Sequence, residues 1–464
     1  MTQTTSRLFP ILSGLGMLAA LTLHGQQSQF QGSVPTGTAS PTALSLTLRD
    51  ALDRGLKTNL GLLVSDSTSE IARGQRIHAL SALLPALTGQ VSQTEEQLNL
   101  KTVGLNVSFP GITIPTIAGP FHYADVRASA SWSVFDYSAI KTHRSAQESE
   151  RAARLSSQDA RDLVVQAVAS DYLQIIADSS RTDAIRSQVQ TAQALYDRAV
   201  DQHNAGLAAG IDVLRSQVEL KQQQQRLLAQ ENQFAKDKLG LGRIIGLPPG
   251  QNLTIAESVP FAPLSSLTQE QALHTALDQR ADYQSYKAQV RAAEETLKAA
   301  RAQRYPTGNI TADYGDVGPS LANSHGTFSF VASARFNIFD SGRISGDVIQ
   351  AKAALKQRQD EMADLGGQID YQVRTAFLDI RTAADQVAVA QSNLELANQT
   401  LGQARDRFSA GVTDNIEVVQ AQESVAAAND SLIAALYGHN LAKVALARTL
   451  GAADQGIQRF VEVK

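Results

Sequence analysis

The sequence predicts an α+β membrane protein made of two copies of one unit, in which a helix is followed by a β-hairpin and then by long helices. Three observations predict this fold class. Four short segments alternate strictly between apolar and polar residues, as strands with one apolar face do. Helical stretches without proline separate these segments, and the same order of strands and helices occurs twice.

Composition and charge narrow the function classes. The chain has 464 residues, of which 43% are hydrophobic and 19% are charged, and its net charge is -4. Because no strong basic field exists, nucleic acid is not an expected partner. The sequence contains no cysteine, which excludes disulfides, thiolate metal sites, cysteine nucleophiles and lipid attachment through an N-terminal cysteine.

The N-terminus has the pattern of a secretory signal peptide over residues 1–25. Arg7 precedes an apolar run from Leu8 to Leu23, and small and polar residues follow. A membrane anchor is the alternative, although the run is short for a spanning helix. Residues 26–43 are rich in Gly, Ser, Pro and Gln, which predicts a flexible leader. Beyond the leader no apolar stretch is long enough to predict a transmembrane helix.

The first repeat covers residues 44–245, and prolines and glycines mark its internal boundaries. Pro85 stops the first helical pattern, and Gly206 and Gly210 interrupt the later one. In order, we expect a helix from Leu46 to Leu84, strands near 86–97 and 121–136, and helices from Tyr137 to His203 and from Ile211 to Ile245.

The second repeat covers residues 267–450 and follows a linker at 246–266. Pro306 stops its first helix as Pro85 stops that of the first repeat. The hairpin region of the first copy is longer by about 17 residues, which an insertion in a surface loop explains. In order, we expect a helix from Leu267 to Tyr305, strands near 307–315 and 326–339, helices over 341–408 and up to Leu450, and a C-terminal tail at 451–464.

The strands pose the question of what their apolar faces contact. In "FSFVASARFNIFD", from Phe328 to Asp340, every second residue is apolar and the others are mostly polar. Four strands cannot close a barrel, since the smallest bacterial barrels have about eight, and lipid does not tolerate open sheet edges. Either the sheet packs on a soluble core, or several chains share one barrel.

The helices favour the shared barrel. The span from Tyr137 to His203 would be roughly 100 Å long if continuous, which no single globular domain houses. Apolar residues also follow heptad steps, as in helices that pair side by side. We therefore expect the apolar strand faces to contact lipid and the polar faces to line a water-filled lumen. The heptad positions are Ile185, Val189, Ala192, Tyr196 and Ala199 in the first copy, and Leu394, Ala397, Leu401, Ala404 and Phe408 in the second.

The duplicated plan resembles that of the TolC-like outer membrane efflux proteins, also called outer membrane factors. The segments "VFDYS" and "IFDSGR", which close the two hairpins, carry the resemblance. So do "RFSAGVTDNIEVVQAQ" at 407–422, its weaker copy "HNAGLAAGIDVLRSQ" at 203–217, and "LGLGRIIGLPP". The resemblance covers about residues 44–450, which is nearly all of the mature chain.

The resemblance implies a homotrimer that forms a 12-stranded outer-membrane β-barrel, continued by an α-helical tunnel across the periplasm. It also implies a passive exit duct for efflux or type I secretion in a Gram-negative bacterium. The expected partners are a periplasmic adaptor (membrane fusion) protein and an inner-membrane transporter of the RND, ABC or MFS type. Neither a cofactor nor a metal is implied.

The resemblance also implies three groups of site residues. Glu417 and Gln420 match a pore constriction at the periplasmic tip, although Glu417 also suits the first turn of a helix, where a carboxylate favours the helix dipole. Asp212 is the repeat mate of Glu417 and is an alternative cap or ion-pair residue. Arg127 and Arg335 lie on polar strand faces and are expected to face the lumen and tune selectivity. The turns expected to dock the adaptor contain Ala205, Gly206, Asp212, Ala410, Gly411 and Thr413.

No pattern in the sequence predicts an enzyme. Asp136 and Asp340 lie between strands and helices and are expected to be helix caps rather than catalysts. No nucleophile elbow, phosphate loop or histidine pair at metal-ligand spacing is present. The alternative function is a secreted or periplasmic structural coiled-coil or adhesin protein without a transport role.

Overall fold

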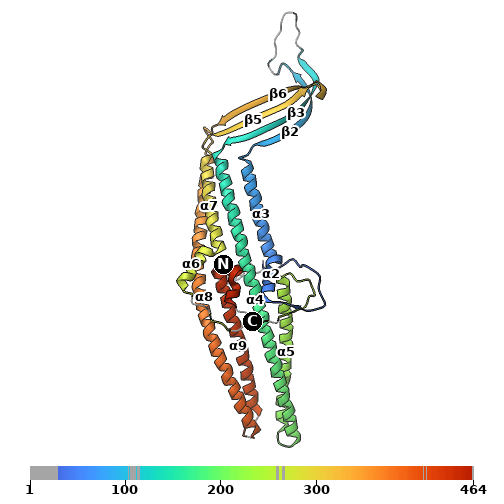
Figure 1. The fold of residues 1–464 in the computed structure, drawn as a ribbon, viewed down its shortest axis with the longest axis vertical. Coiled ribbons are helices and arrows are strands. Elements are labelled where there is room, and N and C mark those ends of the chain that lie inside the picture. The colour runs from blue at the N-terminus through green and yellow to red at the C-terminus, as the bar shows by residue number, and fades with distance from the viewer. Residues whose placement is uncertain are drawn as a thin grey trace, which may run out of the picture. The chain divides into compact units, whose positions relative to one another are not determined.

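A computed structural model describes residues 30–102, 104, 111, 115–255, 257, 261–263, 267–410, 412–413 and 415–461 (Figure 1). The predicted signal peptide at 1–25 lies outside this part of the chain. Two compact units can be distinguished. One comprises Met1–Thr68, Ala153–Ser285 and Ala363–Lys464, and the other comprises Ser69–Ala152 and Tyr286–Met362.

The predicted repeat is visible in the order of the elements. The first copy contains α2 (Leu48–Thr58), α3 (Leu60–Ser81), β2 (Ala86–Asn99), β3 (Ile117–Phe135), α4 (Tyr137–Asn204) and α5 (Gly210–Ile244). The second copy contains α6 (Gln269–Gln279), α7 (Ala281–Ala302), β5 (Thr307–Gly318), β6 (His325–Arg335), α8 (Arg343–Ser409) and α9 (Asn415–Thr449). Outside this plan lie β1 (Leu44–Ser45), β4 (Leu253–Thr254), the short helix η1 (Leu321–Asn323) and α10 (Ala453–Phe460).

The two copies have nearly equal helices. Helices α2 and α6 each have 11 residues, and α3 and α7 each have 22. The long helices α4 and α8 have 68 and 67 residues, and α5 and α9 each have 35. The copies differ in their hairpins, where β2 and β3 are longer than β5 and β6.

The prediction of one uninterrupted helix before each hairpin is wrong. Asn59 separates α2 from α3, and Arg280 separates α6 from α7, both in extended backbone. The Asn59 side chain accepts hydrogen bonds from the amides of Gly61 and Leu62, so it caps the start of α3. Neither break involves proline or glycine, which is why the helical pattern concealed them.

The four long strands form one antiparallel sheet in the order β2-β3-β5-β6 (Figure 1). Strand β5 reaches only as far as Ala124 of β3 in the pairing register. Beyond that point β2 and β3 continue as a two-stranded ribbon that ends in the pair of Asn99 with Ile117. Strands β2 and β6 are the outer strands of this sheet.

Strand β6 is shorter than predicted because a helix cap follows it. It ends at Arg335 rather than near residue 339. The Asp340 carboxylate accepts hydrogen bonds from the amides of Gly342 and Ile344, and Ser341 has a φ of 55°, which no strand accommodates. Asp136 likewise accepts from the amide of Ala139. Both aspartates are therefore caps, as the sequence predicts.

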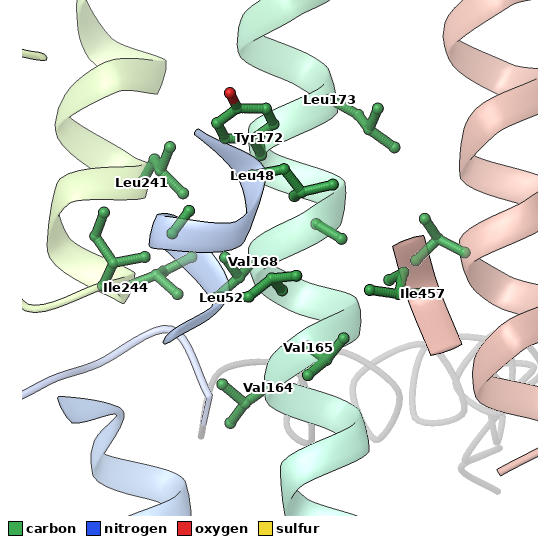
Figure 2. Close-up of a cluster of buried hydrophobic side chains, with 14 of the residues drawn as sticks. Leu48, Leu52, Val164, Val165, Val168, Tyr172, Leu173, Leu241, Ile244 and Ile457 are labelled. Carbon is green, nitrogen blue, oxygen red and sulfur yellow. The ribbon is translucent and has the colours of Figure 1, made fainter. Parts of the chain in front are cut away.

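The largest hydrophobic core lies in the first unit and joins segments that are far apart in sequence. Leu48 and Leu52 of α2 pack with Val168 of α4, and with Leu241 from α5 and Ile457 from α10 (Figure 2). The C-terminal tail predicted at 451–464 therefore contains a helix that belongs to this core.

The segments expected as a leader and a linker also carry ordered contacts. The amide of Val34 donates to the carbonyl of Thr58, and that of Thr36 donates to Gly246. These bonds attach part of the predicted flexible leader to the end of α2 and to the segment that follows α5. Strands β1 and β4 pair in parallel, so the predicted linker at 246–266 returns to the start of the first repeat.

Candidate functional site

The pairing register separates the sheet into one apolar face and one polar face. Leu87 of β2 is opposite Ala130 of β3, which is opposite Ala312 of β5, and Phe330 of β6 completes this row. On this face Leu87 is 79% exposed and Phe330 is 66% exposed. Such exposure of large apolar side chains on one continuous surface indicates contact with lipid or with another protein. The other rows of the apolar face include Gly89, Ala128, Tyr314 and Phe328, and Trp132, Ile310 and Ala332.

The opposite face of the sheet is polar across the same rows. Thr88, Ser129, Asp313 and Ser329 occupy one row from β2 to β6. Arg127 occupies the next row and pairs with Asp125 and Asp313. The predicted lumen residues Arg127 and Arg335 both lie on this polar face by strand alternation.

The turn between α4 and α5 and the turn between α8 and α9 share a backbone hydrogen bond at the end of the long helix. After α4, the amide of Gly206 donates to His203, and that of Leu207 donates to Gln202. This is a Schellman motif, and Gly206 has the positive φ of 73° that the motif requires. After α8, the amide of Val412 donates to the carbonyl of Arg407 in the corresponding bond. Gly411, a predicted docking residue, lies outside the described residues.

Glu417 lies in the first turn of α9 and has two partners across this turn. Its Oε2 accepts from the Thr413 hydroxyl at 2.5 Å, and its Oε1 lies 3.5 Å from Nε of Arg407. The Glu417 side chain is 40% exposed. The carboxylate therefore remains within reach of water or of another chain while the guanidinium holds it at the helix start.

Gln420 and Asp212 have simpler surroundings. Gln420 is exposed on α9, about one turn beyond Glu417. Asp212 lies in the first turn of α5, and its Oδ1 is 3.6 Å from Nη1 of Arg215. The alternative prediction of an ion pair for Asp212 is therefore confirmed.

Apolar side chains are exposed beside both turns. Leu207 is 80% exposed and Val412 is 69% exposed. Leu207 and Val412 each come directly after the capping glycine position of their turn. An apolar residue at this place in a Schellman motif normally packs against the end of its own helix. The predicted docking residues Ala205 and Ala410 are the last residues before the capping glycine positions, and both are exposed.

The two helix pairs contact each other close to these turns. Leu401 and Ala404 of α8 pack with Val418 of α9 and with Leu195 of α4. The guanidinium of Arg198 on α4 lies 5.8 Å from the centre of the Phe408 ring on α8. The predicted heptad positions Ile185, Ala192, Ala199, Ala397, Leu401 and Ala404 are buried, and Val189, Tyr196, Leu394 and Phe408 are half-buried.

Sequence reasoning missed three residues that define these sites. Asp125 and Asp313 flank Arg127, and Arg407 pairs with Glu417. Asp125 is two residues from Arg127 on the same strand face, so alternation alone could have found it. Asp313 lies on another strand, and only the register reveals its proximity.

Comparison with known proteins assigns the chain to a family. A model of the outer membrane efflux protein family matches residues 69–247 and 272–452. The chain therefore belongs to this family, which confirms the resemblance to TolC-like outer membrane factors. The assignment supports an outer-membrane efflux channel and not the alternative of a secreted structural or adhesin protein.

Individual relatives agree with this assignment. The chain is 24% identical over 415 residues to the pyoverdine export outer membrane protein OpmQ of Pseudomonas aeruginosa, covering 87% of this chain and 85% of that protein. It is 24% identical over 429 residues to the toluene efflux pump outer membrane protein TtgC of Pseudomonas putida, with 87% and 82% covered. The crystal structure of the CmeC outer membrane channel of Campylobacter jejuni is 16% identical, and its TM-score is 0.76 with 92% of each chain covered. This last likeness shows a shared fold.

The described helices and acidic side chains form neither a membrane span nor a metal site. Within the described ranges, no helix combines the length and the apolar character needed to cross a membrane. Among the same residues, no group of three or more His, Asp and Glu side chains is placed to hold a metal ion. The family is one of channels rather than enzymes, in agreement with the functional class predicted from the sequence.

Proposed function

We propose that three copies of this chain form one 12-stranded outer-membrane barrel continued by a tunnel of helices, and that the assembly is a passive exit duct. The observation that carries the proposal is a four-stranded sheet with one apolar face, one polar face and two outer strands, β2 and β6, each of which has one edge without a partner strand in the sheet. In lipid such a sheet needs partner strands at both edges. Pairing β6 of one copy with β2 of the next satisfies both edges by rotation.

The helices supply the second part of the proposal. Helices α4 and α8 have 68 and 67 residues, and each pairs with a 35-residue helix through a short turn. Six such pairs in a trimer would surround a tunnel. The duct itself needs no chemistry, because an inner-membrane transporter of the RND, ABC or MFS type supplies the energy.

The exposed turns are the proposed docking surface for a periplasmic adaptor. Ala205, Gly206 and Asp212 belong to the first turn region, and Ala410, Gly411 and Thr413 belong to the second. The exposed Leu207 and Val412 add apolar contact area beside these residues. Adaptor binding would open the tip by moving the helix pairs, as a shift between two states. Glu417 and Gln420 are the proposed constriction residues.

Cell fractionation followed by mass determination of the detergent-extracted protein tests the proposal. We expect the protein in the outer membrane, with a mass three times that of the mature chain. A soluble monomer in the periplasm or medium would contradict both the barrel and the lipid contact of the apolar face.

A further inference from the structure

Arg127 is the centre of a charged cluster on the polar face of the sheet. Its Nε lies 3.3 Å from both carboxylate oxygens of Asp125, and its Nη2 lies 3.2 Å from one of them. Its Nη1 donates to Oδ1 of Asp313 on the neighbouring strand. One guanidinium therefore binds two carboxylates at the same time.

Gly315 makes this arrangement possible. It is the register partner of Arg127 on β5. A Cβ atom at this position would lie 2.5 Å from the carbonyl oxygen of Val126 and 2.8 Å from Cα of Arg127. No side chain fits there unless the strands move apart. The guanidinium of Arg127 can therefore reach from β3 to Asp313 on β5.

The cluster has a net negative charge although an arginine stands at its centre. Two carboxylates and one guanidinium leave one negative charge in each chain. The three side chains are 28%, 23% and 22% exposed for Arg127, Asp125 and Asp313, so this charge is open to water. Arg335 lies on the same face, six residues from the Asp313 row, which is about 20 Å along the strand.

We propose that Asp125, Arg127 and Asp313 determine the ionic selectivity of the barrel lumen, where three copies form a ring that attracts cations and repels anions. The inference rests on the proposed trimeric barrel. A ring of like charges inside a low-dielectric wall concentrates counter-ions. Arg127 is a positioning residue here, because it holds both carboxylates toward the lumen and partly neutralises them. The sequence alone predicts that Arg127 tunes selectivity, and its two carboxylate partners give the cluster a net negative charge.

Reversal potentials of the full-length trimer in planar bilayers, under a gradient of potassium chloride, test the proposal. Asp313→Asn should lower the ratio of potassium to chloride permeability about twofold or more, whereas Arg127→Gln should raise it. Asp316→Asn is the matched control. Asp316 has the same side chain on the same strand, but it alternates to the apolar face and should leave the ratio unchanged.

Two results would overturn the proposal: equal effects of Asp313→Asn and Asp316→Asn, or no effect of Asp313→Asn in a trimer that conducts. Should Arg127→Gln fail to assemble, labelling decides instead. Because the chain has no cysteine, Asp313→Cys and Asp316→Cys each place a single thiol. A cationic thiol reagent should lower the permeability ratio of the Asp313→Cys trimer only, and an unchanged ratio after complete labelling would contradict the proposal.

The same experiment separates this inference from the proposed function. A trimer that conducts, in which labelling at residue 313 changes the current but not the ratio, retains the barrel and removes the selectivity ring. A protein that forms no trimer and no channel overturns both.

Discussion

Arg407 at the end of α8 and Glu417 in the first turn of α9 form an ion pair across the connection between these helices, with Nε 3.5 Å from Oε1. Both side chains are substantially exposed, so the pair contributes about 0.5 kcal/mol or less to stability. Its main effect is to place a carboxylate and its neutralising partner at one end of the helix pair. Replacing either Arg407 or Glu417 by a neutral residue would therefore change the net charge at this end of the helix pair.

Glu417→Gln should lower the preference for cations if three copies of Glu417 surround the pore. Arg407→Gln should raise that preference, because it removes the neutralising guanidinium. The measurement is the potassium to chloride permeability ratio in planar bilayers. Glu423→Gln, at an exposed glutamate farther along α9, serves as the control. An unchanged ratio in Glu417→Gln would refute the constriction role.

Leu207→Asp and Val412→Asp should abolish efflux without disrupting the trimer. Each places a charge on an apolar surface that is exposed beside a proposed docking turn, and burying that charge against an adaptor is costly. Drug or dye accumulation in cells reports efflux, and native mass reports assembly. Leu207→Met keeps the apolar surface and should retain efflux. If the aspartate variants lose the trimer as well, the surface belongs to folding rather than to docking.

Asp171 predicts a pH dependence of stability. Burial, together with the nearby Asp237 carboxylate, raises the pKa of Asp171 on α4 to about 6. The folded state therefore holds this proton more tightly than the unfolded state, and the free energy of unfolding falls as the pH rises from about 4 to 6. Asp171→Asn should remove this dependence and stabilise the protein at pH 8 by on the order of 1–2 kcal/mol.

Thermal unfolding in detergent at pH 5 and pH 8 measures the effect of Asp171→Asn. Asp183→Asn is a suitable control, because this aspartate on the same helix is 70% exposed and pairs with Arg186 at the surface. Its replacement should change the melting temperature little at either pH. A lower melting temperature of Asp171→Asn at pH 8 would contradict the argument.

His439 predicts a stabilising substitution. It is fully buried on α9, and neither ring nitrogen has a hydrogen-bond partner among the residues that the structure describes. The ring packs against Phe261 with centroids 4.8 Å apart. Burial lowers the pKa of His439, and the Lys443 ammonium lowers it further. Because unpaired buried polar groups cost about 1–3 kcal/mol, His439→Leu should raise the melting temperature at neutral pH.

The pH response of His439→Leu supplies a second readout. A histidine that is held neutral destabilises the fold as the pH falls below its unfolded pKa. The gain from His439→Leu should therefore be larger at pH 5 than at pH 8. A destabilised variant at both pH values would indicate that a bound water or partner satisfies the ring.

The strand faces were predictable because alternation is a local property. The positions of Leu87 and Phe330 on one face follow from the two-residue period of a strand alone. The helix breaks at Asn59 and Arg280 were not predictable from periodicity, since the apolar pattern continues through both. The available signal at the first break was Asn59, a capping residue type, followed two residues later by Gly61.

The other features that the sequence did not predict depend on contacts between residues far apart in the chain. Asp313 meets Arg127 only in one register, and the Ala-Ser alternation from Ala128 to Ser131 would satisfy a register shifted by two residues equally well. Helix α10 was missed because it has only eight residues, although Ala453, Ile457 and Phe460 lie at helical spacing on one face. Its Ile457 becomes informative only when α2 and α4 are in place beside it.

The unequal hairpins of two otherwise equal repeats have a consequence for symmetry. Helices α4 and α8 have 68 and 67 residues, and α5 and α9 have 35 each. A trimer would therefore present six nearly equivalent turns between a long and a short helix. The longer β2–β3 ribbon would occur only three times. A partner at the helical ends would meet a pseudo-sixfold surface and could engage with six copies of one motif. Molecules that contact the strand ribbons would meet strict threefold symmetry. A trimer of this duplicated chain would therefore match partners of two different stoichiometries.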